Sequence, residues 1–320
     1  RAVRSAPSNH SVGSHSVGSL SLGPLSVGPL AVGPLSVAPL FAPKVFPSLA
    51  RHRVLLGVVH LQALPGAPAY AGSMERVLDA ALEDAHALLE GGADGLIVEN
   101  FGDRPFFGEQ VPAETIAAMA RCLQAVCAID PDRPVGANVL RNDARAALGL
   151  VAATDARFVR VNVHTGAAVT DQGVLEGRAA QTLRERARLC PGAGILADVH
   201  VKHASPMGSE SLEQAAQDTW SRGMADGLVV SGAGTGQAPE AERVARIRRV
   251  LPKAIVFLGS GVDETNVESL CAQADGAIVA SSLKRDGVLE APVDADRVRR
   301  LVQRLRAMGP APAGEAKYGA

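Results

Sequence analysis

The sequence is poor in features that mark several special classes of protein. Aromatic residues make up only 3% of it, so a folded core must rely on Ala, Val and Leu from the hydrophobic 47%. No apolar run reaches the roughly 18 residues that a membrane-spanning helix needs. The 32 basic and 33 acidic residues nearly cancel, which leaves no positive field for nonspecific nucleic-acid binding. We expect a soluble α/β protein without a transmembrane segment or a nucleic-acid partner.

Cysteine is also scarce, and its spacing excludes the common disulfide and zinc patterns. Cys122, Cys127, Cys190 and Cys271 are scattered along the 320 residues, and no C-x-x-C occurs. Each lies in a segment that we expect to be a helix or a helix end. This distribution is typical of reduced, mostly buried thiols in an intracellular compartment.

Acidic residues are missing from the first part of the chain, where none precedes Glu75. Residues 11–40 consist of six pentapeptides: SVGSH, SVGSL, SLGPL, SVGPL, AVGPL and SVAPL. A period of five fits neither a helix nor a strand, and Gly or Pro recurs every few residues. We therefore predict a disordered, low-complexity extension over residues 1–50.

The role of this extension stays open among three interpretations. Ser, Ala and scattered basic residues without acidic ones are the bias of an organellar transit peptide, which would direct the protein to a plastid or another organelle. The pentapeptides also resemble short tags that load cargo into encapsulin shells. The third interpretation is an untargeted low-complexity extension.

The rest of the chain alternates short apolar runs with polar segments of helical period. The runs cover residues 54–61, 95–100, 135–140, 158–165, 194–201, 227–232, 255–260 and 276–283. Short strands that alternate with helices predict parallel pairing and helix-covered faces. Eight such units predict a single (β/α)8 TIM barrel over residues 52–308, with a disordered tail over residues 309–320. A doubly wound sheet is the alternative, but LQALPGAP after the first run is not a glycine-rich phosphate fingerprint.

Three of the expected helix ends share one short pattern. The segments GGADG, RGMADG and CAQADG precede the second, sixth and eighth predicted strands. Such an internal repeat of a short sequence pattern supports a barrel assembled from repeated units.

Polar residues gather at the ends of the predicted strands, where a barrel places its active site. Side chains alternate along a strand, so one face of the fourth strand and one face of the fifth become polar. These residues are Arg160, Asn162 and His164 on the fourth strand, and Asp198, His200 and Lys202 on the fifth. If they point inward they converge on the mouth of the barrel. The alternative is that Arg160 and Asp198 form a structural ion pair.

Further polar residues end the first three strands. They are His60, Glu99, Asn100, Asn138, Arg141, Asn142 and Asp143. Any one of them could cap a loop, and Asp143 is a candidate N-cap of the next helix.

Gly and Ser gather at the other half of the predicted mouth. SGAGTG (231–236), GSG (259–261) and ASSLK (280–284) follow the sixth, seventh and eighth strands. Small residues let backbone N–H groups approach an anion, and the loops after strands seven and eight commonly bind phosphate in barrels. The predicted phosphate ligands are Gly232, Gly234, Gly259, Ser260, Gly261, Ser281 and Ser282.

Metal binding and covalent catalysis are weaker interpretations of the same residues. His60, Glu99, His164, Asp198, His200 and His203 could ligate a metal, but H-E-x-x-H and a first-strand H-x-H are both missing. We predict no metal site, and the sequence indicates no particular cofactor. Lys202 could form a Schiff base if it were desolvated, but we expect the neighbouring Asp198 to hold its amine protonated.

Seven blocks of the sequence resemble the BtpA family. They are VVHLQALPGAP, GADGLIVENFGD, NVLRNDA, FVRVNVHTGAAVTDQGVLEG, ILADVHVKHA, GSGV and SSLKRDG. The similarity covers about residues 54–300 and leaves out the extension. The block from Arg160 to Gly177, with its TDQG turn, is the most specific.

The resemblance implies a barrel of the ribulose-phosphate-binding type. The family is named for a cyanobacterial protein that is tied to photosystem I accumulation and is peripheral to the thylakoid membrane. Other members occur in organisms without photosynthesis, so photosystem biogenesis is not the general activity. The resemblance also implies a set of site residues, taken from the positions that match the family's motifs. They are Glu99, Asn100, Asn138, Arg141, Asn142, Arg160, Asn162, His164, Asp198 and Lys202.

Two functions remain open. The first is an enzyme that acts on a phosphorylated sugar or nucleoside by lyase, isomerase or glycosidic-bond chemistry. Glu99 or Asp198 would be its general base, and His164 or His200 its acid or electrophile. Arg160 and Asn162 would stabilise negative charge that develops during the reaction. On this hypothesis, Asp198→Asn should fold normally and lose turnover.

The second function is a non-catalytic factor for photosystem I biogenesis or stability. A surface patch outside the mouth would then matter more than the strand ends. Because the sequence offers no amphipathic anchor, any peripheral membrane contact would pass through protein. Ala-rich helix faces are also compatible with a homo-oligomer, although no interface can be identified.

Overall fold

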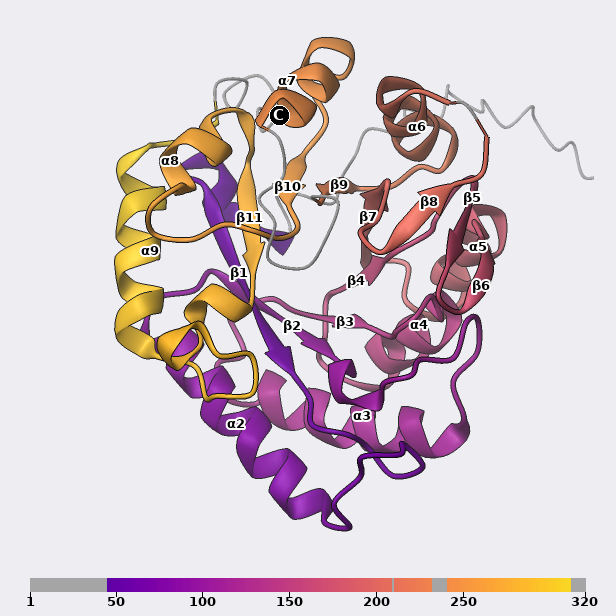
Figure 1. Ribbon diagram of the computed structural model, residues 1–320, viewed down its shortest axis with the longest axis vertical. Coiled ribbons are helices and arrows are strands. Elements are labelled where there is room, and N and C mark those ends of the chain that lie inside the picture. The colour runs from indigo at the N-terminus through magenta and orange to yellow at the C-terminus, as the bar shows by residue number, and fades with distance from the viewer. Residues whose placement is uncertain (1–44, 209, 232–240, 312–320) are drawn as a thin grey trace, which may run out of the picture. The chain divides into compact units, whose positions relative to one another are not determined.

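The computed structural model describes residues 45–208, 210–231 and 241–311, and these residues form a closed parallel barrel (Figure 1). The neighbour order around the barrel is β1-β11-β10-β9-β7-β4-β3-β2. Each predicted strand is present, so the predicted (β/α)8 class is confirmed. The strands are β1 (Val54–His60), β2 (Gly95–Glu99), β3 (Val135–Asn138), β4 (Phe158–Val161), β7 (Gly194–Val199), β9 (Gly227–Val230), β10 (Val256–Leu258) and β11 (Gly276–Val279).

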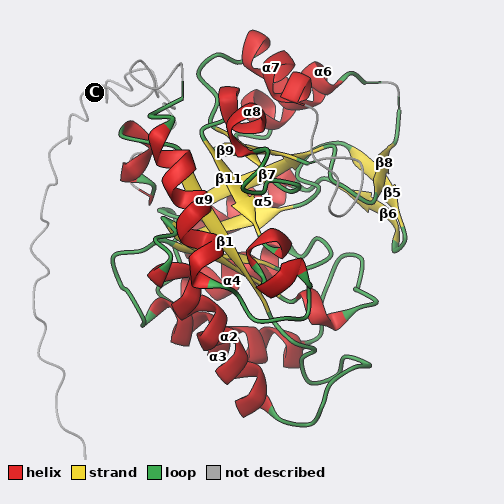
Figure 2. Cartoon of the chain, turned by 60° about the vertical axis from the view of Figure 1, so that its left-hand side comes forward, coloured by secondary structure: helices red, strands yellow, loops and turns green. Residues whose placement is uncertain are grey.

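Helices cover the outside of this barrel, as Figure 2 shows. They are α2 (Met74–Glu90), α3 (Ala113–Cys127), α4 (Ala144–Ala153), α5 (Ala179–Leu189), α6 (Leu212–Gln217), α7 (Ala241–Val250), α8 (Val267–Leu270) and α9 (Ala295–Ala307). In α2 the buried residues recur every three or four positions, as on an amphipathic helix. Gly57 of β1 lets α2 pack closely, because a Cβ there would lie 2.5 Å from Leu88. None of the described helices is long and apolar enough to cross a membrane.

The barrel interior is apolar toward the amino ends of the strands. This part of the core includes residues that we assigned to the N-terminal extension. Val45, Phe46 and Leu49 are buried beside the inward-facing side chains of the strands. The Phe46 ring makes edge contacts with Phe158 and Phe257 at centroid distances of 5.2 and 5.8 Å. The packed fold therefore begins before residue 50, and the expected boundary was too late. The pentapeptides lie outside the described residues.

The C-terminal boundary of the fold also differs from the expected one. Arg53 is buried at the start of β1, and its Nη1 donates hydrogen bonds to the carbonyl oxygens of Met308, Gly309 and Pro310. Ala311 is buried as well. The chain thus stays packed beyond residue 308 because a guanidinium ties the end of α9 to the first strand.

The repeated Ala-Asp-Gly pattern has one structural explanation. Asp94, Asp226 and Asp275 stand directly before β2, β9 and β11. Their Oδ2 atoms accept hydrogen bonds from the backbone N–H groups of Leu55, Ile195 and Val256, which begin neighbouring strands of the barrel. Each aspartate also pairs with an arginine from the helix layer: Arg306, Arg186 and Arg248 respectively. The pattern therefore closes the amino-terminal edge of the barrel.

A small antiparallel sheet projects beside the barrel mouth and was not predicted. It has the order β6-β5-β8, from β5 (Ala167–Thr170), β6 (Gly173–Glu176) and β8 (Ala204–Pro206). We expected a single strand over residues 158–165, but β4 ends at Val161. Beyond it, the side chain of Asn142 bonds both the N–H and the carbonyl of Val163, at 2.9 Å each. The Asn142 side chain thus satisfies backbone groups that a neighbouring strand would otherwise pair. The chain can therefore leave the barrel at this point and form the β5–β6 hairpin.

Candidate functional site

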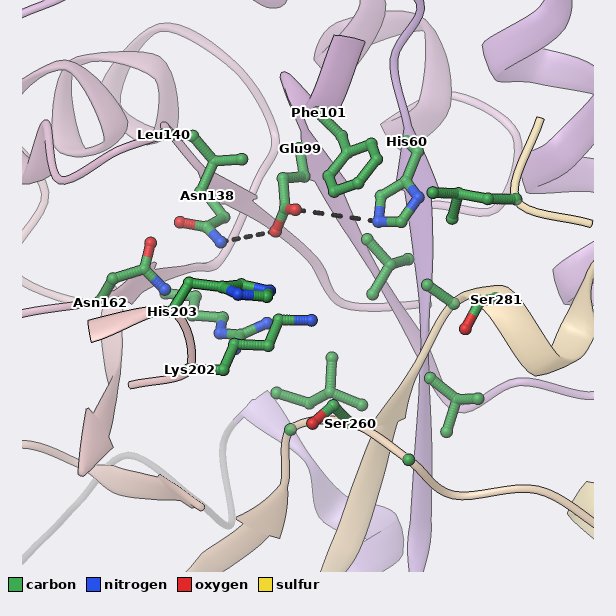
Figure 3. Close-up of a pocket in the computed structure, with 18 of the residues that line it drawn as sticks. His60, Glu99, Phe101, Asn138, Leu140, Asn162, Lys202, His203, Ser260 and Ser281 are labelled. Carbon is green, nitrogen blue, oxygen red and sulfur yellow. Dashed lines mark hydrogen bonds and ion pairs between the residues drawn. The ribbon is translucent and has the colours of Figure 1, made fainter. Parts of the chain in front are cut away.

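A cavity of about 230 Å³ opens at the carboxyl ends of the barrel strands (Figure 3). Two groups of residues line it. The first, which we call the polar wall, consists of Glu99, Asn138, Arg160, Asn162 and Lys202. The second, the glycine–serine rim, consists of Gly259, Ser260, Gly261, Ser281 and Ser282. The structure thus brings together the two halves of the predicted mouth.

Arg160 of the polar wall forms a buried ion pair with Asp198. Nε and Nη2 of Arg160 donate to the two carboxylate oxygens of Asp198 at 3.0 and 2.9 Å. Asn162 Nδ2 adds a hydrogen bond of 2.8 Å, and Ser231 Oγ lies 3.4 Å away. The Asp198 side chain is fully buried and its oxygens are occupied. The structural alternative therefore holds for Asp198, which positions Arg160 and has no open oxygen for general-base chemistry.

Glu99 contributes a carboxylate to the cavity from the polar wall. It is buried at the end of β2, and its Oε2 accepts a hydrogen bond of 2.6 Å from Asn138 Nδ2. Its Oε1 lies 3.8 Å from His60 Nε2. Asn138 thus fixes the carboxylate while one oxygen stays directed toward the cavity and His60. Of the two general bases predicted, Glu99 has the required geometry.

His60 is held uncharged beside this carboxylate. Burial lowers the pKa of His60 to about 4, and this effect outweighs the opposing charge of Glu99. The ring stacks on Phe101 at a centroid distance of 4.2 Å, and the Arg104 guanidinium covers that phenylalanine ring at 4.6 Å. A neutral, stacked imidazole can donate or accept one hydrogen bond without adding charge.

The glycine–serine rim combines small residues with the cavity-lining serines Ser260 and Ser281. A Cβ on Gly259 would lie 2.5 Å from Ser231 Oγ and 2.6 Å from Val229 Cγ1, so a larger residue would displace these two side chains. Gly261 has a φ of 74°, which favours glycine. Ser282 Oγ donates to the Val262 carbonyl at 2.7 Å, so its hydroxyl proton joins the two loops.

Lys202 reaches the cavity from the loop after β7 (Figure 3). Its carbonyl oxygen accepts a hydrogen bond of 2.7 Å from Nη2 of the buried Arg141. Burial, and next the charge of Arg160, lower the pKa of the Lys202 amine, and the opposing effects of Glu99 and Asp198 are smaller. We expected Asp198 to hold this amine protonated. In the structure Asp198 pairs with Arg160, and its charge only partly offsets the effects that lower the pKa of Lys202.

Two predicted site histidines point elsewhere. His164 is buried outside the cavity, and its Nε2 donates to the Gly223 carbonyl at 2.8 Å. His200 has a φ of 53°, which breaks the strand alternation, and it lines a smaller adjacent cavity of about 40 Å³. The geometry therefore gives neither histidine the predicted role of acid or electrophile at the mouth. Gly232 and Gly234 lie outside the described residues.

Other predicted residues have local structural roles. Asp143 caps α4, where its side chain accepts from Ala146 N at 2.8 Å, as the sequence suggested. Asn100 bonds the Leu140 backbone N–H at 2.7 Å. Both side chains shape the loops that carry the polar wall.

Sequence reasoning missed the aromatic part of the cavity. Phe101 and Phe106 line it from the loop after β2. A signal was present, since three of the seven phenylalanines in this aromatic-poor chain fall within residues 101–107.

Four polar atoms of cavity residues are buried without an identified partner. Among the described residues, none forms a hydrogen bond with His60 Nδ1, Arg141 Nε, Asn162 Oδ1 or Ser260 Oγ. A buried polar atom without a partner costs about 1–3 kcal/mol. Several such atoms around one cavity are typical of a site that a polar molecule completes.

The fold and the cavity define a (β/α)8 barrel with a mixed anionic and cationic pocket at its strand ends. The chain belongs to the BtpA family, whose sequence profile matches residues 51–307. The Photosystem I biogenesis protein BtpA of Synechocystis sp. is 43% identical over 265 residues, which are 82% of this chain and 91% of that protein. An uncharacterized protein of Thermococcus kodakarensis is 41% identical over 251 residues, 78% of this chain and 94% of that protein.

Solved structures show the same fold at much lower identity. A structure described as native KDPGal matches with a TM-score of 0.50 and 15% identity, over 79% of this chain and 95% of that one. At this identity the similarity supports the barrel architecture alone.

Proposed function

We propose that the barrel mouth binds a small phosphorylated molecule, a sugar phosphate or a nucleotide, and acts on it as an enzyme. The phosphate lies on the glycine–serine rim, and the reacting part of the molecule faces the polar wall. The observation that carries this proposal is the set of buried polar atoms around the cavity that lack partners among the described residues. They include Ser260 Oγ on the rim and Asn162 Oδ1 on the wall.

The charges around the cavity suit an anion at one end and proton transfer at the other. Nη2 of Arg160 would lie 3.3 Å from a Cβ placed on Gly259 of the rim, so positive charge stands close to the proposed phosphate. Glu99 is the acid–base group, because one of its oxygens is fixed by Asn138 and the other faces the cavity. Lyase, isomerase and glycosidic-bond chemistry all need one such group beside a bound phosphate ester.

Binding of ribose 5-phosphate to the full chain tests the phosphate position. The ligand should raise the midpoint of thermal unfolding in a concentration-dependent manner, while ribose at the same concentration should not. Ser260→Ala removes one buried hydroxyl donor and should weaken binding about tenfold.

Ser269→Ala is the matched control for this experiment. Ser269 is exposed on α8 outside the cavity, and its replacement should leave the affinity unchanged. Equal stabilisation by ribose and ribose 5-phosphate would contradict the phosphate assignment. Unchanged affinity in Ser260→Ala would contradict the role of its hydroxyl.

A second candidate, a factor for photosystem I biogenesis, is favoured by the similarity to the Synechocystis protein. The small sheet offers a surface for such a role, because Val169 and Val174 pair across β5 and β6 and are 48% and 49% exposed. In a Synechocystis strain that lacks its own BtpA, the chain with Glu99→Gln should restore photosystem I if this candidate is right. Val169→Ser with Val174→Ser should then fail, and the opposite pattern would favour the enzyme.

A further inference from the structure

We infer that Lys202 is a covalent catalytic residue that forms an imine with a phosphorylated aldehyde or ketone. The inference rests on the proposed function, since the glycine–serine rim must hold the phosphate while the carbonyl carbon reaches Lys202. It narrows the ligand to a molecule with a free carbonyl group, such as an open-chain sugar phosphate.

The backbone around Lys202 is held in an unusual conformation. His200 and His203 have φ angles of 53° and 57°, two of the four positive values found at non-glycine residues in the described part of the chain. Such angles are disfavoured for residues with a Cβ and persist where the surroundings impose them. The bond from Arg141 to the Lys202 carbonyl fixes the loop between these two positions. The strained loop thus serves to present the Lys202 side chain to the cavity.

Lys202 also lacks the partner that a structural lysine has. Lys284, which is buried after β11, forms a buried ion pair with Asp84. Across the residues that the structure describes, no carboxylate forms an ion pair or a hydrogen bond with Lys202 Nζ. Asp198 is occupied by Arg160 and Asn162. An amine in this position is available to react.

The electrostatic setting disfavours the charged form of the Lys202 amine. Burial and the Arg160 charge lower the pKa of Lys202, as described above. A larger share of the amine is therefore unprotonated near neutral pH than for a lysine in water, and the unprotonated form is the nucleophile.

The reaction balances with groups that the cavity holds. Glu99 takes a proton from the Lys202 ammonium, and the neutral Nζ attacks the carbonyl carbon while the C=O π pair moves to oxygen. Transfer of a proton from nitrogen to that oxygen gives a carbinolamine. Glu99 then returns its proton to the hydroxyl group, the C–O bond breaks and water leaves as the protonated imine forms. Ammonium and carbonyl thus become iminium and water without a further reagent.

Borohydride trapping with glyceraldehyde 3-phosphate tests the inference on the full chain. Hydride reduces the imine carbon to a stable secondary amine, and peptide mapping by mass spectrometry locates it. We expect one adduct per chain, on Lys202. Glyceraldehyde without phosphate should give on the order of tenfold less adduct at the same concentration, because it loses the charged contacts to the rim.

Two lysine variants separate the possible outcomes. Lys202→Arg keeps the charge and should abolish the adduct, while Lys253→Arg, at an exposed position, should not change it. Thermal stabilisation by glyceraldehyde 3-phosphate without any adduct on Lys202 overturns the imine and leaves the phosphate site standing. Absence of both stabilisation and adduct overturns the imine and the proposed function together. Peptide mapping of the adduct on the chain without substitutions identifies the modified lysine, so the test stands even if Lys202→Arg does not fold.

Discussion

At the scale of single residues, burial decides the charge states in the cavity. His60 is nearly enclosed between Phe101 and Glu99, yet the loss of water outweighs the attraction of the carboxylate and the imidazole stays neutral. The same effect, together with Arg160, lowers the pKa of Lys202. Burial therefore favours the uncharged form of the His60 imidazole and of the Lys202 amine, relative to the same groups in water.

The shifted pKa of His60 predicts a specific pH dependence of stability. The folded state has a pKa of about 4, whereas the unfolded chain titrates near 6.5. Between these values the unfolded state binds more protons, so stability is lost as the pH falls below about 6.5. The loss amounts to about 2 kcal/mol at pH 5. His60→Gln lacks this dependence.

Urea unfolding of both proteins at pH 7 and pH 5 measures the effect. His164, His200 and His203 also have lowered pKa values, but they are present in both chains and cancel in the difference. Parallel losses of unfolding free energy in the two proteins would show that His60 is not the group responsible.

At the scale of elements, the aspartates of the three Ala-Asp-Gly segments join neighbouring strands in the same way at three places around the barrel. Each Ala-Asp-Gly segment places a carboxylate under the start of a neighbouring strand and against an arginine of the helix layer. The arginines differ in exposure: the Arg248 side chain is 11% exposed and the Arg306 side chain 43%. The three copies therefore should not contribute equally to stability.

We predict that Asp275→Ala lowers the free energy of unfolding by about 3–5 kcal/mol, because it leaves Arg248 buried without its charge partner. Asp94→Ala should cost less, since water can solvate Arg306. Asp79→Ala, at an exposed position on α2, should change stability by no more than about 0.5 kcal/mol. Chemical denaturation gives all three values, and an equal cost for Asp94 and Asp275 would refute the role of arginine burial.

At the scale of the whole molecule, the thiols report on the integrity of the packed barrel. Cys122, Cys127 and Cys271 are buried in the layer between helices and strands, and Cys190 is half-buried. Burial raises the pKa of Cys122 to about 11 and of Cys127 and Cys271 to about 12. These three thiols are both inaccessible and protonated in the folded state.

We predict that a thiol reagent such as Ellman's reagent at pH 8 modifies these three cysteines only when the fold opens. The reagent should react with Cys190 first, and with the others at a rate set by global unfolding. Addition of guanidinium above the unfolding midpoint should release all four at once. Fast reaction of Cys271 in the native protein would mean that the segment between α8 and β11 opens locally.

The sequence by itself determined the eight strands, the parallel barrel and the position of the polar residues at its mouth. Strand and helix periods are local properties, so the alternation of residues 54–61 through 276–283 suffices to identify them. The family resemblance rested on the same local blocks. Glycine and serine after the last two strands likewise identified the rim before any geometry was known.

Only the tertiary structure decided which of those residues remain open to chemistry. Arg160 and Asn162 occupy the carboxylate of Asp198 with hydrogen bonds, because β4 and β7 are neighbouring strands whose polar side chains meet inside the barrel. Positive φ at His200 ended the strand alternation and turned that side chain away. The small sheet forms because residues 204–206 pair with residues far earlier in the chain. Long-range pairing and backbone conformation at single residues leave little trace in a local pattern, and they set which atoms the cavity presents.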